Sequence, residues 1–215
     1  MDYDHQPAYP RSSLDESDRL TALTYLRAIQ AVHKQNRRRA LASLHDLVRD
    51  GEPPAQPLHG RYHGQLLAFA IAPGVTAFAD AVAARWRFWL GKTFDAPSRT
   101  GDDIYLRTLL RRLRLCWPTY RHYIADTPST WRVFPFRTTL TASITYPTLP
   151  VLRLDYDLPL NPRLSVARTM DELVQLAPEI YVGRAFVHWW WGQWQPVAYF
   201  VLRPAAEADE DKTVP

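Results

Sequence analysis

The segment of residues 181–203, YVGRAFVHWWWGQWQPVAYFVLR, constrains the fold more than any other part of the chain. Its aromatic and β-branched residues favour two strands. Trp191, Gly192 and Gln193 predict the reversal between the strands, because glycine readily adopts the backbone of a tight turn. The segment is therefore expected to form a β-hairpin.

Both faces of the first strand in this hairpin are largely apolar. Alternate side chains of a strand point to opposite faces. The two sets are Tyr181, Ala185, Val187 and Trp189 on one face, and Val182, Phe186 and Trp190 on the other. A sheet with one face exposed to solvent has polar residues on that face, so this pattern requires that both faces be buried. We expect one face to look into a closed or strongly curled barrel and the other to lie under a helix.

Length and composition fit one domain. A chain of 215 residues with 47% hydrophobic residues can build a single core. We expect residues 13–204 to form this domain, and residues 1–12 and the acidic tail 205–215 to be disordered. The net charge of +4 gives little reason to expect a nucleic-acid partner. The one cysteine, Cys116, cannot form an intrachain disulfide or a thiolate zinc site.

The N-terminus lacks the basic and apolar regions of a secretory signal. The longest apolar runs, residues 66–75 and 186–191, are much shorter than the roughly 20 residues that a membrane span needs. We therefore expect a soluble cytoplasmic protein without a membrane span.

Helical spacing of apolar residues runs from Leu20 to Val48 after a capping box at residues 13–16. Two helices are expected there, because a single one would be unusually long. Further helices are predicted over residues 75–90 and from Asp103 to Trp117. Strands are predicted over residues 59–67, 131–141 and 151–157, whereas residues 165–176 fit either a short helix or an irregular strand.

Familiar catalytic motifs do not occur in the sequence. Gly91, Lys92 and Thr93 resemble the end of a phosphate-binding loop, but Trp86 stands where that loop requires glycine. GxGxxG, GxSxG and HExxH are also missing. Common nucleotide, α/β-hydrolase and zincin chemistries are therefore not expected, and we expect no cofactor.

Several polar groups have two interpretations each. His59, His63 and His188 could form a three-histidine metal site, although ordinary hydrogen-bonded histidines are the preferred interpretation and no metal is expected. Asp155 and Asp157 lie on one strand face and could do acid–base work if they are buried, or Asp157 could cap a turn.

The helix predicted from Asp103 carries an arginine row: Arg107, Arg111 and Arg114. This row could bind anions or simply be a solvated helix face, and the modest net charge favours the second interpretation. The consecutive tryptophans Trp189, Trp190 and Trp191 cannot all face inward on a strand. Some of them must line a cavity, lie under a helix or form an interface.

Four segments together resemble the GXWXG domain and the partner domain that follows it. They are the alanine- and leucine-rich residues 40–48, Gly60-Arg61-Tyr62-His63-Gly64, Trp89-Leu90-Gly91-Lys92-Thr93-Phe94 and Tyr156-Asp157-Leu158-Pro159. Tyr62 stands where the family has tryptophan, and the insert between Phe94 and Trp131 departs from the family's compact pattern. The resemblance covers about residues 40–203 and implies a lipocalin-like, calycin-type barrel with a ligand cavity.

The expected fold is therefore α+β: an antiparallel lipocalin-like β-barrel with the N-terminal helices and an inserted helix packed outside. A small barrel of this kind can hold one ligand. We expect a small hydrophobic metabolite that carries a carboxylate or a similar group. The candidate lining residues are Tyr62, Trp89, Tyr156, Phe186, His188 and Trp190, and the candidate polar contacts are His63, Lys92 and Arg184.

Two other functions compete with simple binding. One is a cofactor-independent isomerase, cyclase or hydratase that uses Asp157 or His188 as the general base in the same cavity. The other is an interaction protein whose tryptophan hairpin forms an interface, for example in a homodimer.

Overall fold

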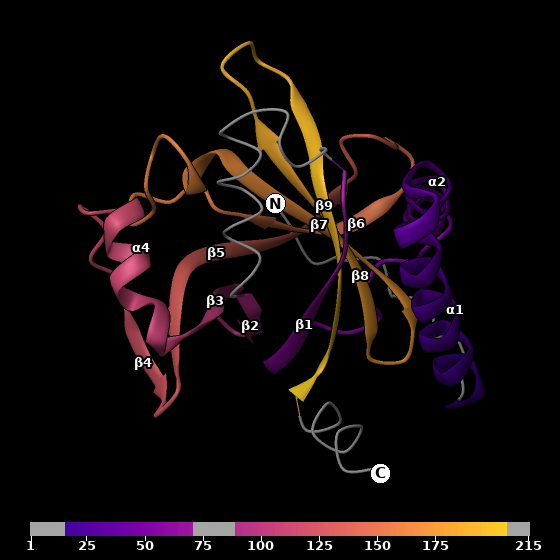
Figure 1. Cartoon of the computed structure of the whole chain (residues 1–215), viewed down its shortest axis with the longest axis horizontal. Coiled ribbons are helices and arrows are strands. Elements are labelled where there is room, and N and C mark those ends of the chain that lie inside the picture. The colour runs from indigo at the N-terminus through magenta and orange to yellow at the C-terminus, as the bar shows by residue number, and fades with distance from the viewer. Residues whose placement is uncertain (1–15, 71–88, 206–215) are drawn as a thin grey trace, which may run out of the picture.

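The computed structural model describes residues 16–70 and 89–205 of the chain (Figure 1). Its helices are α1 (Glu16–Gln35), α2 (Arg37–Arg49) and α4 (Leu110–Cys116), with 3₁₀ turns η1 (Arg107–Leu109) and η2 (Val166–Arg168). Its strands are β1 (Gly60–Phe69), β2 (Trp89–Asp95), β3 (Thr100–Leu106), β4 (Ile124–Thr127), β5 (Thr130–Ala142), β6 (Pro150–Asp155), β7 (Thr169–Ala177), β8 (Ile180–His188) and β9 (Trp194–Pro204). The predictions for residues 1–15, for residues 75–88 of the expected helix and for the tail from residue 206 lie outside the described residues. Trp89 and Leu90, the last two residues of that expected helix, are instead the start of β2.

The described strands form a closed antiparallel barrel. Each strand pairs with the next along the chain from β1 to β3 and from β5 to β9, and the remaining gaps are closed by β3 on β5 and by β9 on β1. Eight strands make this wall, and the short β4 extends it by pairing with β5. The predicted α+β class, with an antiparallel barrel and helices outside it, is confirmed.

The β8–β9 hairpin has the predicted turn and the predicted faces. Gly192 has a φ of +85°, a left-handed backbone that favours glycine. Tyr181, Ala185 and Val187 belong to the cluster of side chains inside the barrel. Val182 belongs instead to the cluster between the barrel and the helices, so both faces of β8 are covered as expected. Trp190, which was expected on the outer face, lies beyond the end of β8 and is exposed.

The two N-terminal helices cover the outside of the wall, at the right of Figure 1. The predicted break between them is confirmed at Asn36, whose side-chain oxygen accepts a hydrogen bond from the Arg39 amide at 3.0 Å and caps α2. Leu44 and Val48 of α2 are fully buried in the outer cluster, which includes Val182 of β8. Packing against the barrel therefore buries the apolar stripe of α2.

The helix predicted from Asp103 is wrong over its first residues. The chain remains a strand from Thr100 to Leu106, and helical structure begins only at Arg107. The acids do not cap a helix, because Asp103 bonds to Lys92 on the neighbouring strand. Residues 165–176, which fitted two interpretations, form the η2 turn followed by most of β7.

Aromatic rings fill much of the described barrel interior. Edge-to-face contacts join Tyr62 to Phe94, Phe94 to Phe136, and Phe136 to Tyr156, with ring centroids 5.3–5.4 Å apart. Gly64 leaves room for the Trp89 ring, which a Cβ at this position would overlap. The barrel therefore has a packed aromatic core, in the manner of other small barrels.

Candidate functional site

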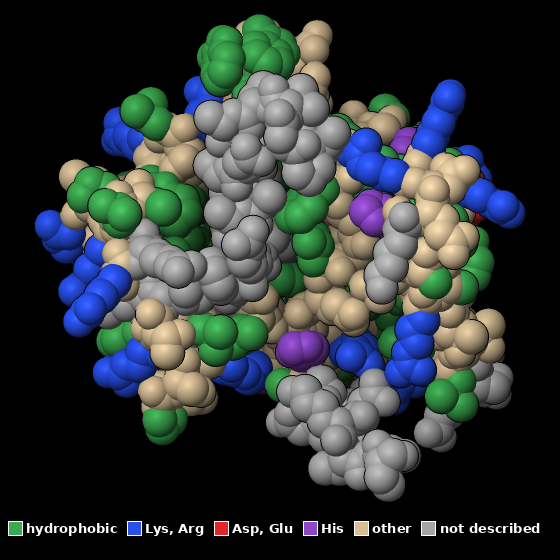
Figure 2. All heavy atoms as spheres, in the orientation of Figure 1, with side chains coloured by type: hydrophobic (Ala, Val, Ile, Leu, Met, Phe, Trp, Pro, Cys, Tyr) green, Lys and Arg blue, Asp and Glu red, His purple; other side chains and the backbone are tan. Residues whose placement is uncertain are grey.

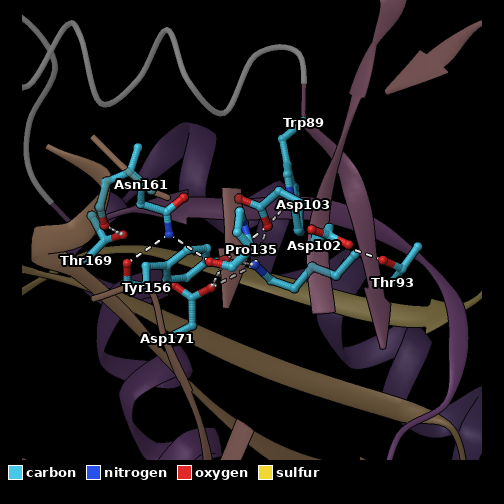
Figure 3. Close-up of polar contacts among 11 residues, drawn as sticks. Trp89, Thr93, Asp102, Asp103, Pro135, Tyr156, Asn161, Thr169 and Asp171 are labelled. Atoms are coloured by element: carbon cyan, nitrogen blue, oxygen red, sulfur yellow. Dashed lines mark hydrogen bonds and ion pairs between the residues drawn. The ribbon is translucent and has the colours of Figure 1, made fainter. Parts of the chain in front are cut away.

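A buried polar cluster lies among these rings, and Figure 3 shows Asp103, Tyr156 and Asp171 converging in it. Lys92 Nζ donates to Asp103 Oδ1 at 2.7 Å, forms an ion pair with Asp171 Oδ2 at 2.8 Å and contacts the Tyr156 hydroxyl. That hydroxyl lies 3.0 Å from Asp103 Oδ1 and 3.1 Å from Asp171 Oδ2. The three N–H groups of the ammonium therefore have three oxygen partners.

Aromatic rings enclose the Lys92 ammonium as well. Nζ lies 5.1–5.4 Å from the ring centroids of Trp89, Phe136, Tyr156 and Phe200, within the range of cation–π attraction. The Lys92 side chain is only 1% exposed. A buried lysine requires paired charges and hydrogen bonds of this kind. The cluster thereby connects β2, β3 and β7 through the barrel interior.

An open cleft lies elsewhere, between the chain after β6 and the end of β8. It has a volume of about 540 Å³ and is lined by Asp155, Asp157, Leu158, Pro159, Arg163, Ala167, Arg168, His188 and Trp194. The two residues predicted as general bases, Asp157 and His188, both line this cleft. They come from segments about 30 residues apart, and the barrel wall brings them to one place.

Hydrogen bonds and ring contacts position the cleft residues. Arg168 Nε donates to the His188 carbonyl at 2.8 Å, and the guanidinium also lies 3.5 Å from His188 Nδ1. The His188 ring packs on the Trp194 ring at a centroid distance of 4.8 Å. The Asp157 amide donates to Asp155 Oδ1 at 2.9 Å, so Asp155, and not Asp157 as was expected, is the side chain that caps this turn. Both carboxylates are exposed and not buried.

The loop between the acids and η2 is held to the barrel by Asn161, which Figure 3 shows beside Tyr156. Its side-chain amide donates to the Pro135 carbonyl at 2.7 Å and to the Tyr156 carbonyl at 2.8 Å. Tyr156 points into the polar cluster, whereas the next residue, Asp157, lines the cleft. The cleft and the internal cluster therefore lie on either side of the same piece of chain.

The predicted ligand-binding residues do not share one cavity. Tyr62, Trp89, Lys92 and Tyr156 lie inside the barrel. His63 lines a groove between β1 and α1, and Trp190 is exposed at the hairpin tip. Arg184 and Phe186 are buried on the outer face of β8, where Arg184 Nη2 pairs with Glu172 Oε2 at 3.0 Å and packs over the Phe186 ring. Whether any of them binds a ligand stays a prediction.

The three histidines considered as metal ligands lie apart. His63 pairs with Arg203 at one end of β9, whereas His188 pairs with Trp194 at the other. Within residues 16–70 and 89–205, no three His, Cys, Asp or Glu side chains are grouped so that they could hold a metal ion.

Sequence reasoning missed Asp103, Asp171, Arg163 and Arg168 as site residues. A signal for Asp103 exists, because it sits directly opposite Lys92 in the β2–β3 register. A lysine and an aspartate in facing positions of neighbouring strands predict an ion pair once both strands are recognised. Arg163 and Arg168 carry no such local signal.

Fold and cleft together define a closed antiparallel barrel with outer helices and a polar cleft on its wall. No family model and no curated protein matches the chain. A solved structure of a protein from Thermomonospora curvata is similar to 76% of this chain and 86% of that one, with a TM-score of 0.46 and 15% identity. Of the helices in the described ranges, none is both long and apolar enough to cross a membrane.

Proposed function

We propose that the protein binds a small metabolite that carries an anionic group and a ring, in the cleft lined by Asp157, Arg163, Arg168, His188 and Trp194. The single observation behind this proposal is that two arginines, a histidine and a tryptophan line one open cleft of about 540 Å³. Arginine is suited to carboxylate and phosphate groups, and a tryptophan ring offers a stacking surface.

The position of the cleft changes the ligand that we expect. A barrel is compatible with an internal ligand cavity, but rings and the Lys92 cluster occupy the described interior positions. A purely hydrophobic ligand suits the cleft poorly, because charged side chains form much of its lining. Arg163 is the exposed cation that would meet the carboxylate expected on the ligand, and Asp155 and Asp157 are the two acids of the same lining.

Calorimetric titration with benzoate tests this proposal, with benzyl alcohol as the uncharged analogue. We expect benzoate to bind saturably and benzyl alcohol to bind more weakly. Arg163→Gln should weaken benzoate binding about tenfold, since a charge-assisted hydrogen bond contributes about 1.5–3 kcal/mol. Arg111→Gln, on the exposed face of α4, is the matched control and should leave the affinity for benzoate unchanged. Equal effects of the two substitutions, or no benzoate binding, would contradict the proposal.

A second function is acid–base catalysis on the bound molecule, as in an isomerase, cyclase or hydratase. It is favoured by one observation, the presence of both Asp157 and His188 in the cleft. Phenylpyruvate is a suitable probe because it combines a ring, a carboxylate and an exchangeable CH₂ group. An enzyme of this class should speed the exchange of these protons with D₂O by about 10²-fold or more, measured by NMR. Asp157→Asn and His188→Gln should each abolish the acceleration; exchange at the buffer rate with the unaltered protein would refute it.

A further inference from the structure

Exposed apolar side chains gather on two neighbouring loops at one end of the barrel. Figure 2 shows hydrophobic side chains over the tip of the β8–β9 hairpin, at the top of the view. Trp190 is 76% exposed and Leu164, on the other loop, is 91% exposed. We call the exposed set the apolar tip; its members are Leu160, Leu164, Trp190, Trp191 and Trp194.

The two loops are close to each other. Leu158, Pro159 and Arg163 of one loop and His188 and Trp194 of the hairpin line the same cleft. The Arg168 guanidinium, just after the first loop, donates to the His188 carbonyl at 2.8 Å. The apolar tip is therefore carried by two loops that meet at the cleft, and Trp194 of the apolar tip lines the cleft itself.

The hairpin part of this surface is held in shape. The Trp191 ring stacks on the Trp189 ring at 4.8 Å and 5°, and the Trp190 ring stands edge-on to both. Trp189 is itself buried in the barrel core. The Gly192 amide donates to the Trp189 carbonyl at 3.0 Å and closes the turn. The tryptophans are thus presented by the fold and are not a collapsed flexible loop.

The charge of this region is suited to a lipid surface. Residues 158–165 and 189–194 contain no acidic residue and one basic residue, Arg163, and the nearest acids in the sequence are Asp155 and Asp157, which line the cleft. Tryptophan prefers the boundary between lipid headgroups and acyl chains, where its ring is apolar and its N–H is hydrated. Arginine beside such side chains is attracted to anionic headgroups. A standard protein interface uses about 20–30 residues a side, far more than these few loop-tip side chains.

We propose that the apolar tip docks the protein on the surface of a lipid bilayer, with Trp190, Trp191 and Leu164 inserted between headgroups and Arg163 beside a lipid phosphate. Docking would place the mouth of the cleft at the membrane surface. The inference rests on the exposed side chains and their charge. It shares Arg163 with the proposed ligand site, and the variants that test it leave Arg163 unaltered.

Vesicle flotation of the full chain tests the proposal, with vesicles of phosphatidylcholine alone or mixed with phosphatidylglycerol. We expect the protein to float with the vesicles, and more strongly with the anionic mixture. The double variant Trp190→Ser, Trp191→Ser should bind about a hundredfold more weakly, at about tenfold per buried tryptophan. Brominated phosphatidylcholine should quench tryptophan fluorescence in the unaltered protein and much less in this variant.

Two further variants keep the test decisive if the tryptophan variant folds poorly. Leu164→Ser lies on the other loop and should weaken flotation about tenfold. Leu20→Ser, at a 66% exposed position on α1, is the matched control and should have no effect. The proposal is overturned if the unaltered protein does not float with either vesicle or if Leu164→Ser and Leu20→Ser behave alike. It is equally overturned if sedimentation shows that the tryptophans hold two copies of the chain together and vesicles do not compete.

Discussion

At the scale of single residues, Lys92 is the side chain whose surroundings are most demanding. Its ammonium is enclosed by two carboxylates, a tyrosine hydroxyl and four rings, and it is 1% exposed. A charge in such a place is tolerated only because its partners replace the lost water. Removing the cation leaves Asp103 and Asp171 buried without the ammonium that they share.

Lys92→Met should therefore lower the free energy of unfolding by about 3–5 kcal/mol, the usual cost of removing one partner from a buried ion pair. Urea denaturation followed by tryptophan fluorescence measures the loss. The triple variant Lys92→Met, Asp103→Asn, Asp171→Asn carries no formal charge at these positions and should recover part of it. A single variant within about 1 kcal/mol of the unaltered protein would show that the cluster is not a major source of stability.

A second residue-scale prediction concerns alkaline pH. Burial raises the pKa of Tyr181 well above its usual value, and the neighbouring Tyr62 and Glu179 add to this shift. The folded state thus favours the neutral phenol. The neutral Tyr181 phenol therefore contributes its full stabilisation below about pH 10, the pKa of tyrosine in the unfolded chain. This stabilisation is lost as the pH rises towards the higher pKa of Tyr181 in the folded state.

Tyr181→Phe should accordingly lose less stability than the unaltered protein between about pH 9 and pH 11, since it has no hydroxyl to ionise. Urea unfolding at a series of pH values gives the two slopes. Tyr25→Phe, at an exposed position on α1, should leave the slope unchanged. Identical slopes for all three proteins would mean that Tyr181 ionises as readily in the folded state as in the unfolded one.

At the scale of elements, the local sequence pattern predicted a helix or strand correctly where the residues that set its ends lie within the same segment. The β8–β9 hairpin was predicted because its turn residue lies within the segment itself, and the division into two N-terminal helices was predicted from the length of the helical pattern. The Asn36 cap that marks the break was not predicted. β3 was missed because Asp102 and Asp103 have the composition of a helix start. Only the facing Lys92, on another strand, shows why Asp103 belongs in a barrel.

The close approach of the paired strands β1 and β2 at Gly91 gives a prediction at this scale. Gly91 has a φ of +143°, and a Cβ there would overlap the Tyr62 carbonyl of β1. Gly192 has a φ of +85° but open space around it. Gly192→Ala should lower the free energy of unfolding by about 1–2 kcal/mol, because of the backbone conformation alone. Gly91→Ala should lower it by about 1–3 kcal/mol more, because β1 and β2 must move apart. Chemical denaturation of both variants checks the difference, and equal costs would contradict it.

At the scale of the whole molecule, sequence could predict the barrel better than the site. Alternating apolar residues indicate which side chains face inward, but not how large the enclosed space is once Trp89, Phe136 and Phe200 are packed in it. Asp157 and His188 were singled out as bases for an internal cavity, yet they meet on the cleft outside. Their distance along the chain leaves no local pattern, and only closure of the wall brings them together.

The closed wall also predicts how stability is distributed. β8 is paired along its length with both β7 and β9, whereas α1 contributes Leu26 and Ile29 as its buried residues in the outer cluster. Amides of β8 should exchange with solvent only through global unfolding, and those of α1 faster, through local undocking of the helix. Hydrogen exchange followed by mass spectrometry at increasing urea separates the two routes. Leu26→Ala should raise the exchange rates in α1 more than those in β8. Equal increases in the two elements, or equal protection of α1 and β8 in the unaltered protein, would mean that helix and barrel unfold as one unit.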